Sequence, residues 1–344
     1  MVVLNLSLSE CYITNENKSR MSFIPRFQAL FKPEQYHGWG KTKKYFEGWY
    51  YKLVTADESN AFAFIPGIAM DQNGNKQAFI QVLDGKNLKA EYFKFDAADF
   101  QPTKGKFDVT IVNNHFTRTG FKVNLPGITG ELSFKNQVPW STSLYSPNIM
   151  GPFTFVPFMQ CYHGILSMNH TIQGKLDVNG KEIDFTGGRG YMEKDWGKSF
   201  PSGYIWMQTN HFSKPGISMK SSVAKIPWLG SSFIGFIAGI LVHDRLIEFT
   251  TYNLTKLRKS YADESMVHIV MENRKHRLEI RAEREAATAL ASPIQGFMDG
   301  RIEESMTAVI HTQLYDKKSK TYILDDMGRN AGLEVAGRIE DVLV

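Results

Sequence analysis

Apolar and polar residues alternate in short runs along most of the chain, and turn residues separate each run from the next. Ala61–Ile65 is one such run, while Gly174–Val178 and Lys181–Phe185 flank Asn179-Gly180, the signature of a type I′ hairpin. A period of two residues is typical of strands with one buried face. We therefore predict an all-β protein of antiparallel strands, closed into barrels or sandwiches because an open sheet leaves unpaired edges.

Two segments depart from this alternation. Ala286–Ala291 has a helix-favouring composition, but it is short and Pro293 would end a helix there. The apolar run Ile226–Val242 is slightly shorter than a membrane-spanning helix, and glycines and serines interrupt it. Because His243-Asp244-Arg245 and another apolar run follow, we predict a strand, a tight turn and a second strand.

The chain of 344 residues is long enough for two domains. We place the division at the glycine-rich segment 186–190. This gives a partly unstructured leader over residues 1–35, a β-barrel-like domain over 36–186 and a second one over 187–344. The first twenty residues lack the pattern of a signal peptide, so we expect a cytoplasmic protein, with peripheral membrane contact as an alternative.

Composition and charge exclude several classes of protein. Hydrophobic residues make up 42% of the chain and charged residues 22%, which argues against disorder and a coiled coil. The net charge of +5 is a weak field at this length, and no basic stripe indicates a nucleic acid partner. The clusters Lys41–Lys44 and Lys317–Lys320 fit solvated turns, with contact to anionic lipid headgroups as the alternative.

The common catalytic motifs are incomplete. Gly197-Lys198-Ser199 ends like a phosphate-binding loop, but Met192 stands where that loop needs glycine. His268, Glu272 and His276 have the spacing of metal ligands on a helix, yet their neighbours favour a strand. A nucleophile elbow is also missing, so the common hydrolase chemistries lack support.

Two aromatic segments carry carboxylates. Strand alternation in the first would place Tyr45, Glu47, Trp49 and Tyr51 on one face and Phe46, Gly48 and Tyr50 on the other. Burial among these rings would raise the pKa of Glu47 and make it a proton donor. An ordinary aromatic strand, with Glu47 exposed or capping a neighbour, explains the pattern as well.

The second segment runs from Tyr191 to Asn210. Glu193 and Asp195 precede Trp196, and the next strand would present four side chains on one face, Tyr204, Trp206, Gln208 and Asn210. Ring faces beside polar amides suit an amphipathic aromatic ligand. A loop held by carboxylate hydrogen bonds beside a buried Trp is the alternative.

These two segments carry a resemblance to a known family. Tyr45-Phe46-Glu47-Gly48-Trp49-Tyr50 and Glu193-Lys194-Asp195-Trp196-Gly197, followed by Phe200-Pro201 and Trp206-x-Gln208-x-Asn210, resemble the tocopherol cyclase family from about residue 36 onward. The resemblance implies two lipocalin-like halves packed together, distantly similar to carotenoid hydratases. It also implies closure of a chromanol ring in a prenylated hydroquinone. Where plant and cyanobacterial cyclases have an acidic-Pro-His stretch, this chain has Val156–Gln160, and His163 is the nearest histidine.

Chromanol closure adds a phenol oxygen to an alkene, so it needs a positioned acid, ring faces that stabilise positive charge, and dry surroundings. We expect Asp195 or Glu193 to be the acid, with Glu47 as the competing candidate. The expected substrate-binding residues are Trp49, Tyr50, His163, Trp196, Tyr204, Trp206, Gln208 and Asn210. Because the reaction is an isomerisation, we expect no redox cofactor and no metal.

Two other hypotheses stay open. A lipocalin-like carrier of isoprenoid quinones needs the cavity but not the acid, and an isoprenoid hydratase would add water to the double bond. In each case the expected partner is a hydrophobic isoprenoid or prenylquinol. The apolar residues Trp228, Leu229 and Phe233 are candidates for contact with a membrane, although core packing explains them as well.

Overall fold

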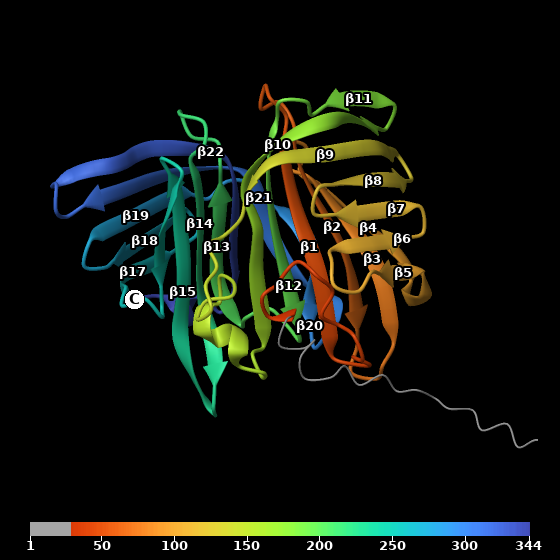
Figure 1. Cartoon of the computed structure of the whole chain (residues 1–344), viewed down its shortest axis with the longest axis horizontal. Coiled ribbons are helices and arrows are strands. Elements are labelled where there is room, and N and C mark those ends of the chain that lie inside the picture. Colours follow the sequence, from red (N-terminus) through yellow and green to blue (C-terminus); the bar gives the residue numbers. More distant parts are fainter. Residues whose placement is uncertain (1–28) are drawn as a thin grey trace, which may run out of the picture.

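Two large antiparallel sheets stand side by side in the computed structural model, which describes residues 29–344 (Figure 1). Most of the expected leader therefore lies outside the described residues. In the described part, the helices are three short 3₁₀ turns: η1 (Ala97–Asp99), η2 (Gly151–Phe155) and η3 (Ile339–Val342). The all-β prediction is confirmed.

The first half of the described chain forms a sheet of twelve strands in the order β4-β3-β2-β1-β12-β10-β9-β8-β7-β6-β5, with β11 paired to β10. Their bounds are β1 Tyr45–Val54, β2 Ala61–Met70, β3 Lys76–Asp84, β4 Lys89–Asp96, β5 Phe100–Pro102, β6 Asp108–Ile111, β7 Asn114–Thr117, β8 Gly120–Leu125, β9 Ile128–Val138, β10 Cys161–Val178, β11 Lys181–Asp184 and β12 Arg189–Gly197.

The second half forms a sheet of ten strands within the described residues, in the order β16-β15-β14-β13-β22-β21-β19-β18-β17, with β20 paired to β21. Their bounds are β13 Gly203–Thr209, β14 Ser218–Trp228, β15 Ser231–Val242, β16 Arg245–Thr250, β17 Lys256–Ala262, β18 Met266–Glu272, β19 His276–Glu283, β20 Thr288–Ile294, β21 Phe297–Asp316 and β22 Thr321–Gly337.

Each half encloses its own hydrophobic core, because alternate residues of its strands point inward. A third cluster of buried apolar residues lies between the halves, where β2, β3, β4 and β10 contact β14, β20 and β21. The predicted pair of packed lipocalin-like halves is therefore confirmed. A site at the junction can draw side chains from both sheets.

The predicted turns are confirmed in detail. Asn179 and Gly180 have φ of 54° and 80°, and His243 and Asp244 have φ of 50° and 57°, as a type I′ turn requires. The run Ile226–Val242 forms the end of β14, a hairpin turn and β15 rather than a helix. The described residues include no helix with the length and apolarity that crossing a bilayer requires.

One segment with a helix-favouring composition forms a strand, and the change from the first sheet to the second comes after the glycine-rich segment 186–190. Part of the segment Ala286–Ala291 lies in β20 instead of a helix, because β21 offers backbone partners and Leu290 is buried between the halves. β12 begins at Arg189 and completes the first sheet, so the sheets change at residues 198–202. The division into domains at 186–190 stays a prediction.

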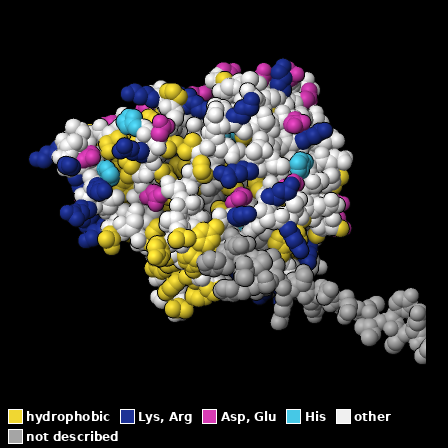
Figure 2. All heavy atoms as spheres, viewed as in Figure 1, with side chains coloured by type: hydrophobic (Ala, Val, Ile, Leu, Met, Phe, Trp, Pro, Cys, Tyr) yellow, Lys and Arg dark blue, Asp and Glu magenta, His cyan; other side chains and the backbone are white. Residues whose placement is uncertain are grey.

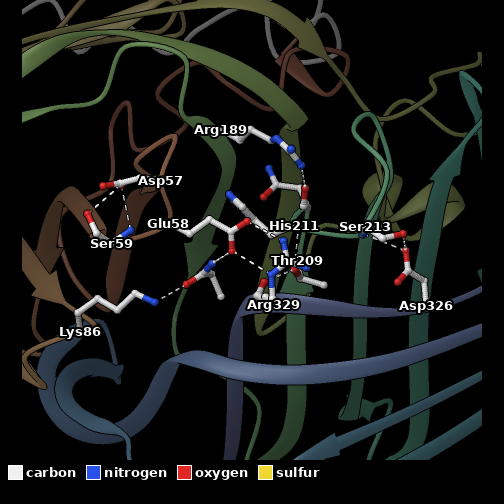
Figure 3. Close-up of polar contacts among 12 residues, drawn as sticks. Asp57, Glu58, Ser59, Lys86, Arg189, Thr209, His211, Ser213, Asp326 and Arg329 are labelled. Carbon is white, nitrogen blue, oxygen red and sulfur yellow. Dashed lines mark hydrogen bonds and ion pairs between the residues drawn. The ribbon is translucent and has the colours of Figure 1, made fainter.

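Polar side chains join the halves near the end of β1 (Figure 3). Arg329 on β22 donates hydrogen bonds of 2.7 and 3.1 Å to Glu58, which lies in the turn after β1. Asn330 donates to the same carboxylate at 2.6 Å and accepts a 2.6 Å hydrogen bond from Lys86. These contacts fix turns of the first half on β22.

Candidate active site

A cavity of about 200 Å³ lies between the halves, alongside the first residues of β1. Its walls are mostly apolar and aromatic, and they come from both sheets. Rings from both sides contribute, with Tyr50 and Trp206 in an edge-to-face contact at 5.7 Å between centroids. Few polar side chains interrupt this lining, so the position of each one matters.

The first half contributes a row of side chains that strand register brings together. Gly48 on β1 lies opposite Asp195 on β12, and Asp195 lies opposite His163 on β10. In the next inward row, Tyr50 lies opposite Glu193. All five residues line the cavity because they share one face of neighbouring strands.

His163 and Asp195 form a hydrogen-bonded pair on this wall. His163 Nδ1 lies 2.8 Å from Asp195 Oδ1. Since a carboxylate only accepts, Nδ1 carries the proton, and in the neutral tautomer that this contact selects Nε2 is the acceptor. Within the described residues Nε2 has no hydrogen-bond partner, and Glu193 Oε2 lies 3.5 Å away. This histidine is therefore oriented as a proton acceptor.

Glu193 is the buried carboxyl group of the same wall. Its Oε2 accepts a hydrogen bond of 2.5 Å from Tyr191 and one of 3.2 Å from Trp206 Nε1, which reaches across from the second half. Burial raises the pKa of Glu193, and the nearby His163 opposes that rise. Glu193 thus joins the two halves at the cavity and can exist in either protonation state.

The second half contributes a facing row from β14, β13, β22 and β21. Ser222 lies opposite Trp206, Trp206 opposite Glu334, and Glu334 opposite Glu304. Tyr204 donates a 2.7 Å hydrogen bond to Glu334, and burial raises the pKa of Glu334 well above its ordinary value. Two more carboxyl groups therefore face the cavity from this wall.

Glu304 is the most buried of these acids. Its Oε1 accepts a hydrogen bond from Tyr50 of the first half, whereas Oε2 has no hydrogen-bond partner among residues 29–344. Burial raises the pKa of Glu304 to about 7, although Tyr50 and Lys52 favour the ionised form. A carboxyl group with this pKa is mostly protonated below pH 7 and about half protonated at pH 7.

Lys220 on β14 also lines the cavity. It is fully buried, it donates a 2.7 Å hydrogen bond to Ser222, and it takes part in no ion pair among the described residues. Burial lowers the pKa of Lys220 to about 8, while Glu193 and Asp195 favour its charged form. Its ammonium group can donate to an oxygen of a bound ligand.

Glu47 lies on the opposite face of β1, away from the cavity. It pairs with the buried Lys194 and accepts hydrogen bonds from Tyr45 and from the backbone of His37. Burial alone would raise the pKa of Glu47, but Lys194 and His37 outweigh burial and hold it below the ordinary value. In this environment Glu47 is an ionised structural group.

The structure brings six of the expected site residues to the cavity, Tyr50, His163, Glu193, Asp195, Tyr204 and Trp206. Trp49 and Trp196 share the face of Glu47 and pack in the core of the first half. Gln208 continues the inward row of β13 beyond the cavity, where its side chain accepts a 3.1 Å hydrogen bond from Lys52. Asn210 donates a 2.9 Å hydrogen bond to Gly190 O.

Glu304, Glu334 and Lys220 were not among the residues expected from the sequence. A signal for the first exists, since Glu304 is in phase with the apolar Ile302 and Met306 along an alternating strand. A charged residue at such an inward position needs a partner or a role. Which partner it meets depends on the contact between sheets, and strand periodicity carries no information on that contact.

Within residues 29–344, His163, Glu193 and Asp195 are also the group that could hold a metal ion. One ligand atom from each lies within 4.8 Å of the others, and imidazole with carboxylates is a common donor set for divalent metals. The hydrogen bond between His163 and Asp195 already accounts for the arrangement without an ion.

Comparison with known proteins agrees with this architecture. The sequence model of the tocopherol cyclase-like family matches residues 140–337, more than half of the chain. The matched region includes all of the residues that line the cavity except those from β1, β2 and β3. The chain belongs to the tocopherol cyclase-like family.

Two plant relatives of this family carry names with an activity. The chloroplastic tocopherol cyclase of Zea mays is 28% identical over 193 residues, which are 53% of this chain and only 40% of the maize protein. The probable chloroplastic tocopherol cyclase of Oryza sativa subsp. japonica is 22% identical over 377 aligned residues, which cover 91% of this chain and 80% of the rice protein. The resemblance of this chain to the family is confirmed.

A solved structure shares the fold. The crystal structure of CghA with Sch210972 has a TM-score of 0.54 and 11% sequence identity, and the match covers 85% of this chain and 88% of CghA. At this identity the likeness shows that both chains have the same arrangement of strands.

Proposed function

We propose that this tocopherol cyclase-like protein is an enzyme that closes a chromanol ring in a prenylated hydroquinone by acid catalysis. One observation carries the proposal. Across a single apolar cavity, the buried carboxyl group of Glu304 faces the wall on which Asp195 orients His163 as a proton acceptor. Ring closure needs both groups, since one carbon gains a proton and one oxygen loses a proton.

Glu304 supplies the proton to the alkene. Its Oε2 lacks a protein partner among the described residues, and its pKa, raised to about 7, leaves a large share of the group protonated at neutral pH. Protonation of the less substituted alkene carbon leaves positive charge on the tertiary carbon. The faces of Trp206 and Tyr50 stabilise this charge in surroundings that exclude most water.

His163 takes the proton of the phenol. As the phenol oxygen forms a bond with the tertiary carbon, its O–H proton passes to His163 Nε2, and Asp195 stabilises the imidazolium that forms. Glu193, 3.5 Å from the same nitrogen, can share this proton. Water that enters when the product leaves returns a proton to Glu304 and removes one from His163, so the reaction remains an isomerisation.

The first experiment follows the mass of the product. Purified protein is incubated with a prenylated hydroquinone, and the products are separated and weighed by mass spectrometry. A cyclised product keeps the mass of the substrate but loses the redox activity of a free hydroquinone. A gain of one water would instead support a hydratase, and unchanged substrate bound to the protein would support a carrier.

The second experiment tests the acid. Glu304→Gln should lower turnover by about 10² or more, because the amide cannot donate the proton, while ligand binding persists. Glu303→Gln is the matched control, since Glu303 is the exposed neighbour on the same strand. Near-normal turnover of the Glu304 variant would exclude it as the acid and favour Glu193.

A further inference from the structure

The mouth of the cavity carries an exposed apolar surface. We define the apolar tip as Phe153, Phe158, Trp228, Leu229 and Phe233, from η2, the segment after it and the β14–β15 hairpin. Figure 2 shows hydrophobic side chains gathered at the end of the molecule where this hairpin projects in Figure 1. Leu229 is 78% exposed and Phe158 is 51% exposed.

The apolar tip is continuous with the cavity. Trp228 contacts Phe153, Phe158 and Phe233 at ring-centroid distances of 5.6 to 6.0 Å. Phe153 and Phe233 in turn line the cavity, together with Ile226 and Pro227 of the same hairpin. The apolar surface of the tip therefore continues into the lining of the cavity.

The same mouth carries cationic side chains next to a second turn. Gly296, between β20 and β21, donates a 2.6 Å hydrogen bond to Lys198 O, and it lies so close to β1 that a Cβ there would be 2.2 Å from Tyr45 N. Pro293 of β20 and Met298 of β21, on the two sides of this turn, line the cavity. The exposed Lys44 and Lys198 therefore lie beside the mouth, and neither forms an ion pair within residues 29–344.

We propose that this end of the molecule docks on an anionic lipid bilayer, with the apolar tip inserted among the acyl chains and Lys44 and Lys198 at the headgroups. Exposed aromatic and aliphatic side chains beside unpaired lysines are what an interfacial membrane contact requires. The contact places the cavity mouth on the bilayer, so a prenylated ligand moves between lipid and protein without entering water. This placement extends the proposed function, but the docking itself does not depend on turnover.

Vesicle sedimentation with the full chain tests the docking. We expect binding to phosphatidylcholine vesicles that contain phosphatidylserine, and weaker binding to phosphatidylcholine alone or at high salt. Leu229→Asp should weaken binding about tenfold or more, because it replaces the leucine side chain that inserts into the bilayer with a charged one. Lys198→Glu should weaken binding only to the anionic vesicles.

The chain offers matched controls for both variants. Leu88 is also an exposed leucine at a turn with positive φ, 53° against 44° for Leu229, but it lies between β3 and β4 at the other end of the strands. Leu88→Asp and Lys318→Glu, in the distant β21–β22 turn, should bind vesicles like the unchanged protein. Equal binding by Leu229→Asp and Leu88→Asp would overturn the proposal.

A different partner for the apolar tip would give different results in the sedimentation experiment. If the tip joins two copies of the chain, the unchanged protein stays in the supernatant and Leu229→Asp converts a dimer into a monomer, which overturns the proposal. Turnover of a short-chain, water-soluble prenylhydroquinone is measured separately and should survive Leu229→Asp. Absence of turnover by the unchanged protein would refute the proposed function while vesicle binding still reports on the docking.

Discussion

The two faces of β1 and β12 bury carboxyl groups in opposite ways. On the face toward the core of the first half, Glu47 is enclosed with Lys194 and with hydrogen-bond donors, and its pKa is lowered. On the face toward the cavity, Glu193 meets hydroxyl, indole and imidazole groups, and its pKa is raised. The two glutamates are on paired strands, and both are almost fully buried.

The comparison shows that burial alone does not make a proton donor. Glu47 and Glu193 lose similar contact with water, but Glu47 has a lysine in direct contact and Glu193 has none. A cation in contact favours the charged form of a buried acid, whereas burial without such a contact favours the protonated form. The difference in pKa therefore assigns a structural role to the face that carries Glu47 and the proposed catalytic role to the face that carries Glu193.

The largest expected effect is on stability, and it tests the face of β1 and β12 that points toward the core of the first half. Lys194→Met should cost about 3–5 kcal/mol of the free energy of unfolding, because it leaves the Glu47 carboxylate buried without its cation. Lys220→Met, on the cavity face, should change that free energy by no more than about 1 kcal/mol, since Lys220 has no ion pair among the described residues. Urea unfolding measures both, and equal losses would contradict the distinction between the faces.

The next effect tests the cavity face. Asp195→Asn should lower turnover by about 10², because the amide no longer holds His163 in the tautomer that accepts a proton at Nε2. The free energy of unfolding should change little. Glu193→Gln should also lower turnover, by up to about 10², if Glu193 shares the proton of His163.

Two controls accompany these variants. Asp184→Asn, an exposed aspartate on β11, should leave turnover unchanged. A chelator should also leave the unchanged protein fully active. The contrary result is that chelation abolishes turnover and addition of one divalent cation restores it. That result would show that His163, Glu193 and Asp195 bind a metal ion and do not act as a proton relay.

The smallest effect is the dependence on pH. Since burial raises the pKa of Glu304 from 4.5 to about 7, its contribution to stability is complete below pH 4.5 and is lost as the pH rises through 7. Relative to Glu304→Gln, the unchanged protein should lose at most about 3 kcal/mol over this range, measured by urea unfolding at each pH. Turnover should fall over the upper part of the same range. A stability difference that does not change with pH would show that Glu304 is ionised throughout.

Much of the fold could be predicted from the sequence, because strand alternation and turn chemistry act locally. The hairpins at Asn179-Gly180 and His243-Asp244 depend on φ preferences within a few residues, and both form as expected. The segment Ala286–Ala291 shows the limit of local reasoning. Its composition favours a helix, but pairing with β21 decides the outcome.

The site could be predicted only in part, because its contacts also join segments that are distant in the sequence. Alternation correctly separated the face of Tyr50 from the face of Glu47, and it grouped Tyr204 with Trp206. It did not indicate which face meets the other half of the molecule, so Trp49 and Trp196 were expected at the ligand. Glu304 meets Tyr50 across 254 positions of sequence, a contact that no local pattern specifies.

The cavity lies at a seam between two halves that each have a core of their own. Substitutions at the seam therefore reshape the pocket without loosening either core, and each wall can change while the other keeps its proton-handling groups. Gly48 illustrates the freedom this gives, since a methyl group there would make only ordinary contacts of 3.6 to 3.8 Å. Such a scaffold can acquire new substrates during evolution at little cost in folding.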